Sequence, residues 1–246
     1  MLLFKRKVFW IVVTLIIILS LLWQTAIVEI IIYTTFSASE DKGAIALSFD
    51  DGPDWGEEIL ISELNEAGMK VTFFWIYEKI ELLKNEDSDR FDKLLRLLKE
   101  GGHEVGIHGY ECRGSQNPIT RFLFANELEN LLNLKQKFHS ILDKEPVLFR
   151  SHGPRSGRQF YNQLRESNLH LIFGSLTYQI SITASEDIFI DHFTEATSGT
   201  IICAHDSRNC DPDYGLAVEI ANIVPELVKI MHDRNIEVVT VSELLD

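Results

Sequence analysis

Apolar residues in this chain form short β-branched or aromatic runs that alternate with longer amphipathic stretches. The runs predict seven strands, at Ala44–Phe49, Lys70–Trp75, His103–His108, Pro146–Arg150, Leu169–Gly174, Thr200–His205 and Ile236–Thr240. Helical spacing marks Asp92–Gly101, Ala125–Asp143 and Ile220–Asp233. Strands separated by helices pair in parallel, and seven such units in about 200 residues predict a closed or nearly closed α/β barrel. A doubly wound open sheet is the alternative.

The first part of the chain has a different pattern. Lys5–Lys7 precede the uncharged run "VFWIVVTLIIILSLLW", and the apolar stretch continues to Ile32. A bilayer span needs about 20 mostly apolar residues, and basic residues before it favour a cytoplasmic N-terminus. We therefore expect a transmembrane signal anchor. The alternatives are a signal peptide cleaved near Ser37–Ser39 and a core helix, although no polar face appears before Gln24.

These patterns divide the chain in two. Residues 1–40 are expected to form a cytoplasmic tip, the anchor and a short linker, and residues 41–246 a single domain without internal repeats. The protein would then be a single-pass membrane protein whose domain lies outside the cytoplasm. If the N-terminal segment is cleaved, the domain would be secreted.

Charge and cysteine content narrow the classes further. A net charge of −14 argues against a nucleic-acid partner and suits a neutral or cationic substrate. Three cysteines, Cys112, Cys203 and Cys210, do not form a disulfide framework. One bridge with one free thiol is compatible with an oxidising compartment, and Cys203 and Cys210 are the nearest pair in sequence.

Polar residues follow or end several of the predicted strands. Asp50 and Asp51 follow the first strand, His108 ends the third, Arg150 the fourth, and His205 the sixth. In a parallel barrel all of these ends lie on one face, where such folds carry their chemistry. Each residue alone has an ordinary structural explanation, but their convergence from four segments favours a functional site.

Two aspartates, two histidines and an arginine, without a glycine-rich phosphate loop or an activated serine, fit metal-assisted hydrolysis. Aspartate and histidine are common ligands of a zinc-like ion, and a second carboxylate can take a proton from the metal-bound water. Adjacent aspartates can therefore divide the work between a ligand and a base. By contrast, His103 opens a strand rather than ending one, and we interpret it as structural.

Four segments then carry a family resemblance. In order, "LSFDDGPDW", "GHEVGIHGYEC", "LFRSHGPRSG" and "GTIICAHDS" resemble the polysaccharide deacetylases of carbohydrate esterase family 4, the chitin and peptidoglycan deacetylases. The closing "IEVVTVSELL" is similar to the last strand of that family. The resemblance implies a distorted (β/α) barrel, in agreement with the strand count.

The resemblance also implies individual roles. Asp50 resembles the catalytic base, and Arg150 the arginine that holds this base in place. Gly153 falls where a backbone N–H stabilises the oxyanion, and His205 resembles the general acid that protonates the leaving amine.

The implied metal site holds a divalent cation, with Zn²⁺ the preferred ion. Asp51 and His108 match two of the family's metal ligands. The second histidine of the family's His-x-x-x-His pair is Cys112 here. We expect its thiolate to complete the ligand set, and a buried or disulfide-bonded Cys112 is the alternative.

A second departure concerns the general acid. The family places a carboxylate after its fifth strand that tunes the acidic histidine, but Gly174–Ala184 contains none.

The expected function is metal-dependent removal of N-acetyl groups from an amino-sugar polymer or oligomer. A catalytically degenerate relative that binds glycan or acts as a scaffold is the alternative.

Overall fold

The structure, a computed structural model, describes residues 13–14, 17, 34–35, 37–109, 112, 131–151, 158–175, 186–207 and 214–246. Within this part, the strands form one eight-stranded sheet. The strands are β1 (Thr34–Thr35), β2 (Ala44–Gly52), β3 (Thr72–Ile76), β4 (Glu104–Gly109), β5 (Leu148–Phe149), β6 (His170–Ile172), β7 (Ile201–His205) and β8 (Glu237–Val239). Each of the seven predicted strands is present.

All strand pairs in this sheet are parallel. The order is β1-β6-β5-β4-β3-β2-β7, and β8 pairs with the first residues of β2. Beyond β6, the backbone N–H of Ser175 donates to the carbonyl of Ile201 at the start of β7, with an N–O distance of 2.8 Å. This contact links the β6 side of the sheet to β7, and the fold is a parallel-strand half-barrel that is consistent with the predicted (β/α) barrel.

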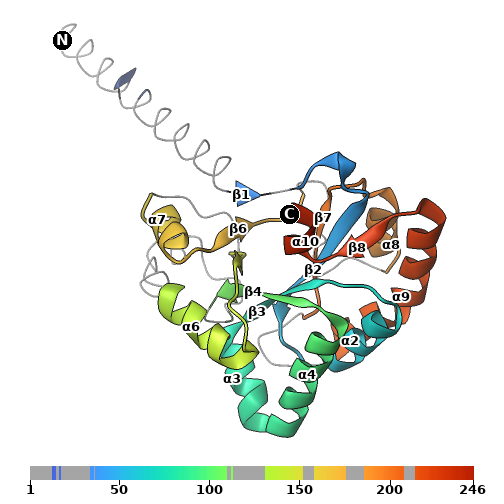
Figure 1. Ribbon diagram of the computed structural model, residues 1–246, viewed down its shortest axis with the longest axis horizontal. Coiled ribbons are helices and arrows are strands. Elements are labelled where there is room, and N and C mark those ends of the chain that lie inside the picture. Colours follow the sequence, from blue (N-terminus) through green and yellow to red (C-terminus); the bar gives the residue numbers. More distant parts are fainter. Residues whose placement is uncertain are drawn as a thin grey trace, which may run out of the picture.

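Helices lie around the strands, with α6 and α7 on one side and α8 and α9 on the other (Figure 1). The described helices are η1 (Glu40–Lys42), α2 (Glu57–Glu66), α3 (Tyr77–Glu86), α4 (Ser88–Gly101), α6 (Leu131–Leu142), α7 (Arg158–Glu166), α8 (Glu186–Glu195), α9 (Gly215–Arg234) and α10 (Val241–Leu245). Capping residues fix both ends of α4. The side chain of Asp87 accepts from the N–H of Arg90 at the start of α4, and Gly102 ends this helix in the left-handed conformation.

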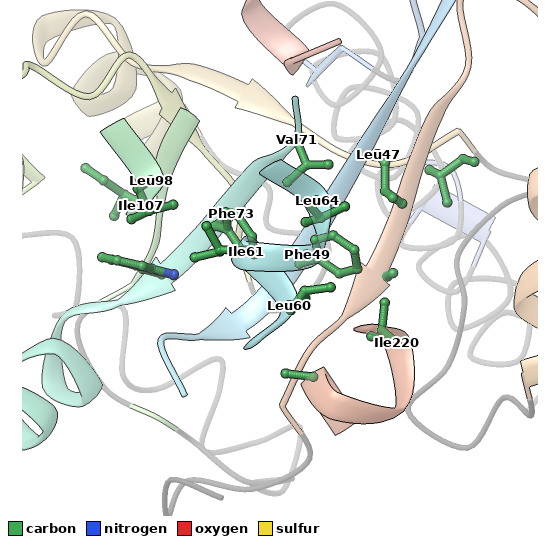
Figure 2. Packing of buried hydrophobic residues seen from close by; sticks show 14 of the residues in the cluster. Leu47, Phe49, Leu60, Ile61, Leu64, Val71, Phe73, Leu98, Ile107 and Ile220 are labelled. Carbon is green, nitrogen blue, oxygen red and sulfur yellow. The ribbon is translucent and has the colours of Figure 1, made fainter. Parts of the chain in front are cut away.

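The two faces of β2 contact different parts of the core. Leu47 and Phe49 point toward α2 and α9, where they pack with residues such as Leu60 and Ile220 (Figure 2). Ala44 and Ala46 belong to a second cluster that also contains Phe74 of β3, Leu148 of β5 and Val241 of α10. Since successive strand residues point to opposite faces, Ser48 and Asp50 continue this second face toward the carboxyl end of β2.

The N-terminal prediction is only partly open to comparison. No helix among the described residues is long and apolar enough to cross a bilayer. The stretch from Val8 to Ile32 lies almost entirely outside the described residues, so the anchor stays a prediction. The sheet includes β1, which precedes the predicted domain start at Asp41, and Ser37 pairs with Thr200.

Candidate active site

The structure gathers the predicted polar residues at the carboxyl ends of the strands. Asp50 and Asp51 lie in the last part of β2, His108 in the last part of β4 and His205 at the end of β7, while Arg150 directly follows β5. Asp50, His108 and Arg150 are buried, whereas the side chains of Asp51 and His205 are 21% and 24% exposed. The face therefore has a buried ionic centre and a solvent-accessible rim.

Register shifts place two of these side chains. Asp50 pairs with Phe74 and Gly52 with Trp75, so Asp51 is an extra residue relative to β3. On the other side of β3, the register shifts again around His108. A bulge redirects a side chain that regular alternation would send to the opposite face. Asp51 adopts φ 75°, and both carboxylates of the aspartate pair consequently lie near His108.

Arg150 holds the Asp50 carboxylate within the barrel. Its Nη1 lies 2.7 Å from Asp50 Oδ1 and donates to Ser48 Oγ at 2.9 Å. Its Nε donates to the carbonyl of Ile172 at 3.3 Å, and the guanidinium carbon lies 4.0 Å from the ring centroid of Phe74. A buried guanidinium needs this combination of a counter-charge and hydrogen-bond acceptors.

Cys203 contributes a contact that the sequence patterns did not indicate. Its thiol donates to Asp50 Oδ2 at an S–O distance of 3.4 Å, and it lies on β7 beside β2. Burial raises the pKa of the Cys203 thiol, and the neighbouring Asp50 charge raises it further. Cys203 is therefore a protonated donor to the carboxylate rather than a nucleophile.

The electrostatics keep Asp50 ionised. Burial alone would raise the pKa of Asp50, but the Arg150 and His108 charges outweigh it and hold that pKa below its ordinary value. The pKa of His108 shifts the other way. Burial of His108 lowers its pKa, but the carboxylates of Asp50 and Asp51 raise this pKa by more. The carboxylate of Asp50 is thus available as a proton acceptor.

His108 is oriented for ligation. Its Nδ1 lies 2.9 Å from the backbone carbonyl of Arg150, which fixes a proton on Nδ1 because a carbonyl can only accept. Its Nε2 lies 3.3 Å from Asp51 Oδ1 and 3.9 Å from Asp50 Oδ2. A histidine that binds a metal through Nε2 has the same second contact at Nδ1.

His205 faces the same carboxylate from the other side. Its Nε2 lies 3.9 Å from Asp51 Oδ2, and its side chain reaches solvent. The segment Gly174–Ala184, where the family has its carboxylate, is described only at Gly174 and Ser175, and its other residues lie outside the described part of the chain. Among the described residues, Asp51 is thus one acidic neighbour of His205.

Cys112 corrects two cysteine predictions. It is disulfide-bonded, whereas Cys203 is a free buried thiol. The pairing suggested by proximity in sequence, Cys203 with Cys210, is therefore wrong. A disulfide sulfur carries no thiolate charge and is not a zinc ligand of the expected kind, so the structure favours the disulfide alternative for Cys112.

Gly153 and His103 are the remaining residues that the sequence singles out. Gly153 lies outside the described residues. His103, read as structural, is bonded at both ring nitrogens away from this face.

Two of the side chains on this face are suitable ligands for a divalent cation. Asp51 and His108 present a carboxylate and an imidazole nitrogen to one location, which is suitable chemistry for zinc. No group of three or more His, Cys, Asp or Glu side chains within the described part of the chain is arranged to hold a metal ion. Any further ligands would thus come from water, substrate or other residues.

An ionised buried carboxylate, an adjacent carboxylate–imidazole pair and a partly exposed histidine at the strand ends of an α/β fold are the kinds of groups that acyl hydrolysis uses. Sequence comparison gives the family. The profile described as "Polysaccharide deacetylase" matches residues 37–171, and the chain belongs to this family.

Individual relatives agree with this assignment. A peptidoglycan-N-acetylglucosamine deacetylase of Bacillus cereus is 28% identical over 218 residues, covering 87% of this chain and 93% of the relative. A crystal structure of a peptidoglycan N-acetylglucosamine deacetylase superposes with a TM-score of 0.65 at 20% identity, covering 87% of this chain and 92% of the other.

The same fold also includes an inactive relative. A family 4 pseudoenzyme from Bacillus anthracis superposes with a TM-score of 0.62 at 14% identity, covering 87% of this chain and 69% of the other. Membership therefore establishes the fold and family, and activity has to be argued from the site.

Proposed function

We propose that this protein is a membrane-anchored, metal-dependent hydrolase that removes N-acetyl groups from an amino-sugar polymer or oligomer of the peptidoglycan or chitin kind. The observation that carries the proposal is the Arg150–Asp50 pair, 2.7 Å between Nη1 and Oδ1, beside the Asp51–His108 pair. One carboxylate is held as a base by Arg150, while its neighbour in sequence faces His108, where it would act as a ligand.

Each residue has a role in amide hydrolysis. Asp50 accepts a proton from the attacking water, and Arg150 keeps this carboxylate ionised and oriented. His205, the more exposed imidazole, donates a proton to the departing sugar nitrogen. Asp51 and His108 would hold a divalent cation, for which we prefer zinc, and the cation would polarise the acetyl carbonyl and acidify a water molecule. We assign Gly153 as the oxyanion donor from the family pattern.

The substrate class follows from charge and from the relatives. A chain with a net charge of −14 disfavours polyanions and suits a neutral N-acetylglucosamine polymer. The relatives described above act, by their names, on peptidoglycan N-acetylglucosamine. The N-terminal apolar segment would place the domain outside the cytoplasm, where such polymers occur.

A second candidate is a catalytically degenerate protein that binds glycan without turnover. The disulfide at Cys112 favours it, because the family's second metal histidine is at this position. Against it stands the intact geometry around Asp50, which glycan binding alone does not require.

Acetate release tests the proposal. The full-length protein in mild detergent, supplied with zinc, should release acetate from N-acetylchitooligosaccharides or peptidoglycan fragments, and the Asp50→Asn variant should not. Binding of these glycans without acetate release under zinc, cobalt and manganese would favour the degenerate protein.

Protease added to intact cells should degrade the domain and spare the anchor, whereas a cytosolic full-length protein would contradict the topology.

A further inference from the structure

A buried charged cluster lies next to the site but outside the residues assigned above. Lys79, Asp54 and Asp206 are each 1% exposed, and Glu57 and Ser207 are fully buried. Lysine is rarely buried unless it is paired, because removing an ammonium group from water is costly. The position of Lys79 therefore calls for a specific explanation.

Lys79 connects three strand ends. It lies in the first turn of α3, directly after β3. Its Nζ donates to the backbone carbonyl of Asp51 at 2.9 Å and to Ser207 Oγ at 2.6 Å, with Asp54 Oδ2 at 3.8 Å. One ammonium group thus joins the β2 bulge to the residues that follow His205.

The Asp51 carbonyl is a sensitive place for this contact. Asp51 has a left-handed backbone, φ 75°, which a residue other than glycine adopts only when its surroundings impose it. Holding the carbonyl fixes the orientation of this peptide, and with it the direction of the Asp51 side chain. That side chain lies between His108 Nε2 at 3.3 Å and His205 Nε2 at 3.9 Å.

The acidic members of the cluster lie around the ammonium group, with Asp54 at 3.8 Å and Asp206 close enough to feel its charge. Glu57 accepts from the N–H of Asp54 at 3.1 Å and from Trp75 Nε1 at 2.9 Å. Burial, together with the neighbouring Asp206, raises the pKa of Glu57 well above its ordinary value. Burial likewise raises the pKa of Asp206 to about 8. The Glu57–Asp206 pair therefore retains a proton, and the negative charge around Lys79 stays moderate.

We infer that Lys79 is a positioning residue, which holds the Asp51 peptide and the end of β7 so that the Asp51 carboxylate faces both His108 and His205. The effect on turnover rests on the proposed deacetylase function, but the geometric effect does not. Lys79 itself contacts neither the reacting groups nor a ligand nitrogen.

A second buried lysine provides a matched control. Lys135 of α6 is 6% exposed, and its Nζ donates to the carbonyl of Ser167 at 2.9 Å, near Glu145 at 3.6 Å. It has a similar burial and a similar backbone acceptor, but Ser167 lies just before β6, at the opposite end of the barrel. A purely structural role for a buried lysine should therefore look alike in both variants.

The experiment compares Lys79→Met with Lys135→Met in the full-length, zinc-loaded protein. Two readouts are taken: the NMR shifts and line widths of the His108 and His205 ring protons, and the kcat and KM for an N-acetylchitooligosaccharide. We expect Lys79→Met to change both histidine signals and to lower kcat by about 10- to 100-fold with little change in KM, since small misplacements of reacting groups have effects of this size. Lys135→Met should leave the signals and kcat unchanged.

A milder variant covers the case in which Lys79→Met does not fold. Ser207→Ala keeps the Lys79–Asp51 contact and removes the link to β7, so it should change the His205 signal more than the His108 signal. Unchanged histidine signals in a folded Lys79→Met or Ser207→Ala protein would overturn the inference. If the parent protein has no deacetylase activity but the histidine signals still change, the proposed function fails and the positioning inference stands.

Discussion

The two ends of β4 each carry a buried polar side chain, and the protein uses them in different ways. Glu104, at the start of the strand, is 8% exposed, and His108, near its end, is 3% exposed. Three residues separate them along β4, so they lie toward opposite ends of the barrel. A comparison of the two networks separates polar residues that stabilise the fold from those that perform chemistry.

At the amino end, hydrogen bonds from neutral donors surround Glu104. Its carboxylate accepts from Thr72 Oγ1 at 3.0 Å, from the N–H of Ser242 at 3.1 Å and from Ser242 Oγ. Thr72 Oγ1 in turn accepts from the N–H of Val241 at the start of α10. This network holds the start of α10 against Thr72 of β3 and Glu104 of β4, at the amino end of the barrel.

At the carboxyl end, charged groups face one another at close range. Two carboxylates, two imidazoles and a guanidinium lie together, and Arg150 Nη2 is buried without a hydrogen-bond partner among the described residues. A network built only for stability would rarely place like charges in neighbouring positions. A buried carboxylate whose hydrogen bonds come from neutral donors, as at Glu104, therefore indicates a structural role. Several charged groups held close together at a partly exposed strand end instead indicate a functional role.

The largest effect should come from the carboxyl end. Asp50→Asn removes the base, so kcat should fall by about 10³-fold or more, while zinc measured by elemental analysis should remain near the parent level. Asp51→Asn should lose both zinc and activity. If zinc loss follows Asp50 instead, or neither variant loses it, the division of roles between the adjacent aspartates is wrong.

The matching change at the amino end should affect stability alone. Glu104→Ala leaves several buried donors without their acceptor, so the free energy of unfolding should fall by about 2–4 kcal/mol. Urea unfolding measures this loss, and kcat at a temperature where the variant is folded should stay within about twofold of the parent value. A large fall in kcat without a loss of stability would contradict the contrast between the two ends.

The strands and most of the site could be predicted because both follow from local sequence. Strands of a parallel barrel are covered on both faces, so they appear as continuous apolar runs such as "AIALSF". Polar residues directly after these runs lie on one face. On this basis alone Asp50, His108, Arg150 and His205 were brought together correctly.

The remaining features depend on three-dimensional pairing. The bulges at Asp51 and His108 are set by the register against β3, which no single segment encodes. The disulfide at Cys112 depends on how loops meet in space. Lys79 was missed because a charged residue at a helix start usually faces solvent, although its place four residues before the buried Leu83 was an available signal.

A pH-dependent effect at the amino end sharpens the comparison further. His103 accepts from the N–H of Val71 at Nδ1 and donates from Nε2 to Asn65 Oδ1, an arrangement that requires the neutral ring. Burial lowers the pKa of His103 to about 4 from its ordinary 6.5. Between these values the unfolded chain binds a proton that the folded protein does not, so stability is lost as the pH falls from 6.5 to 4, by up to about 3 kcal/mol.

His103→Gln tests this contribution, since an amide can accept and donate similarly without titrating. Urea unfolding at pH 7, 5.5 and 4 should show a smaller loss of stability on acidification than in the parent protein. His139→Gln, which changes an exposed histidine, should behave like the parent. Equal acid sensitivity of His103→Gln and the parent would remove His103 from the explanation.

The smallest expected effect concerns Cys112 and distinguishes a structural from a chemical role at the carboxyl end. Because Cys112 is disulfide-bonded, its sulfur has no thiolate to offer, and in the proposed site Asp51 and His108 would be the protein ligands. Cys112→Ser should therefore change zinc affinity little in the oxidised protein, as measured by competition with a chromogenic chelator, while lowering the melting temperature. Cys112→His restores the family's second histidine and should tighten zinc binding if this position can reach the metal. A sharp loss of zinc affinity in Cys112→Ser would instead mean that the thiolate is a ligand, and that Cys112 belongs with the reacting charges rather than with the scaffold.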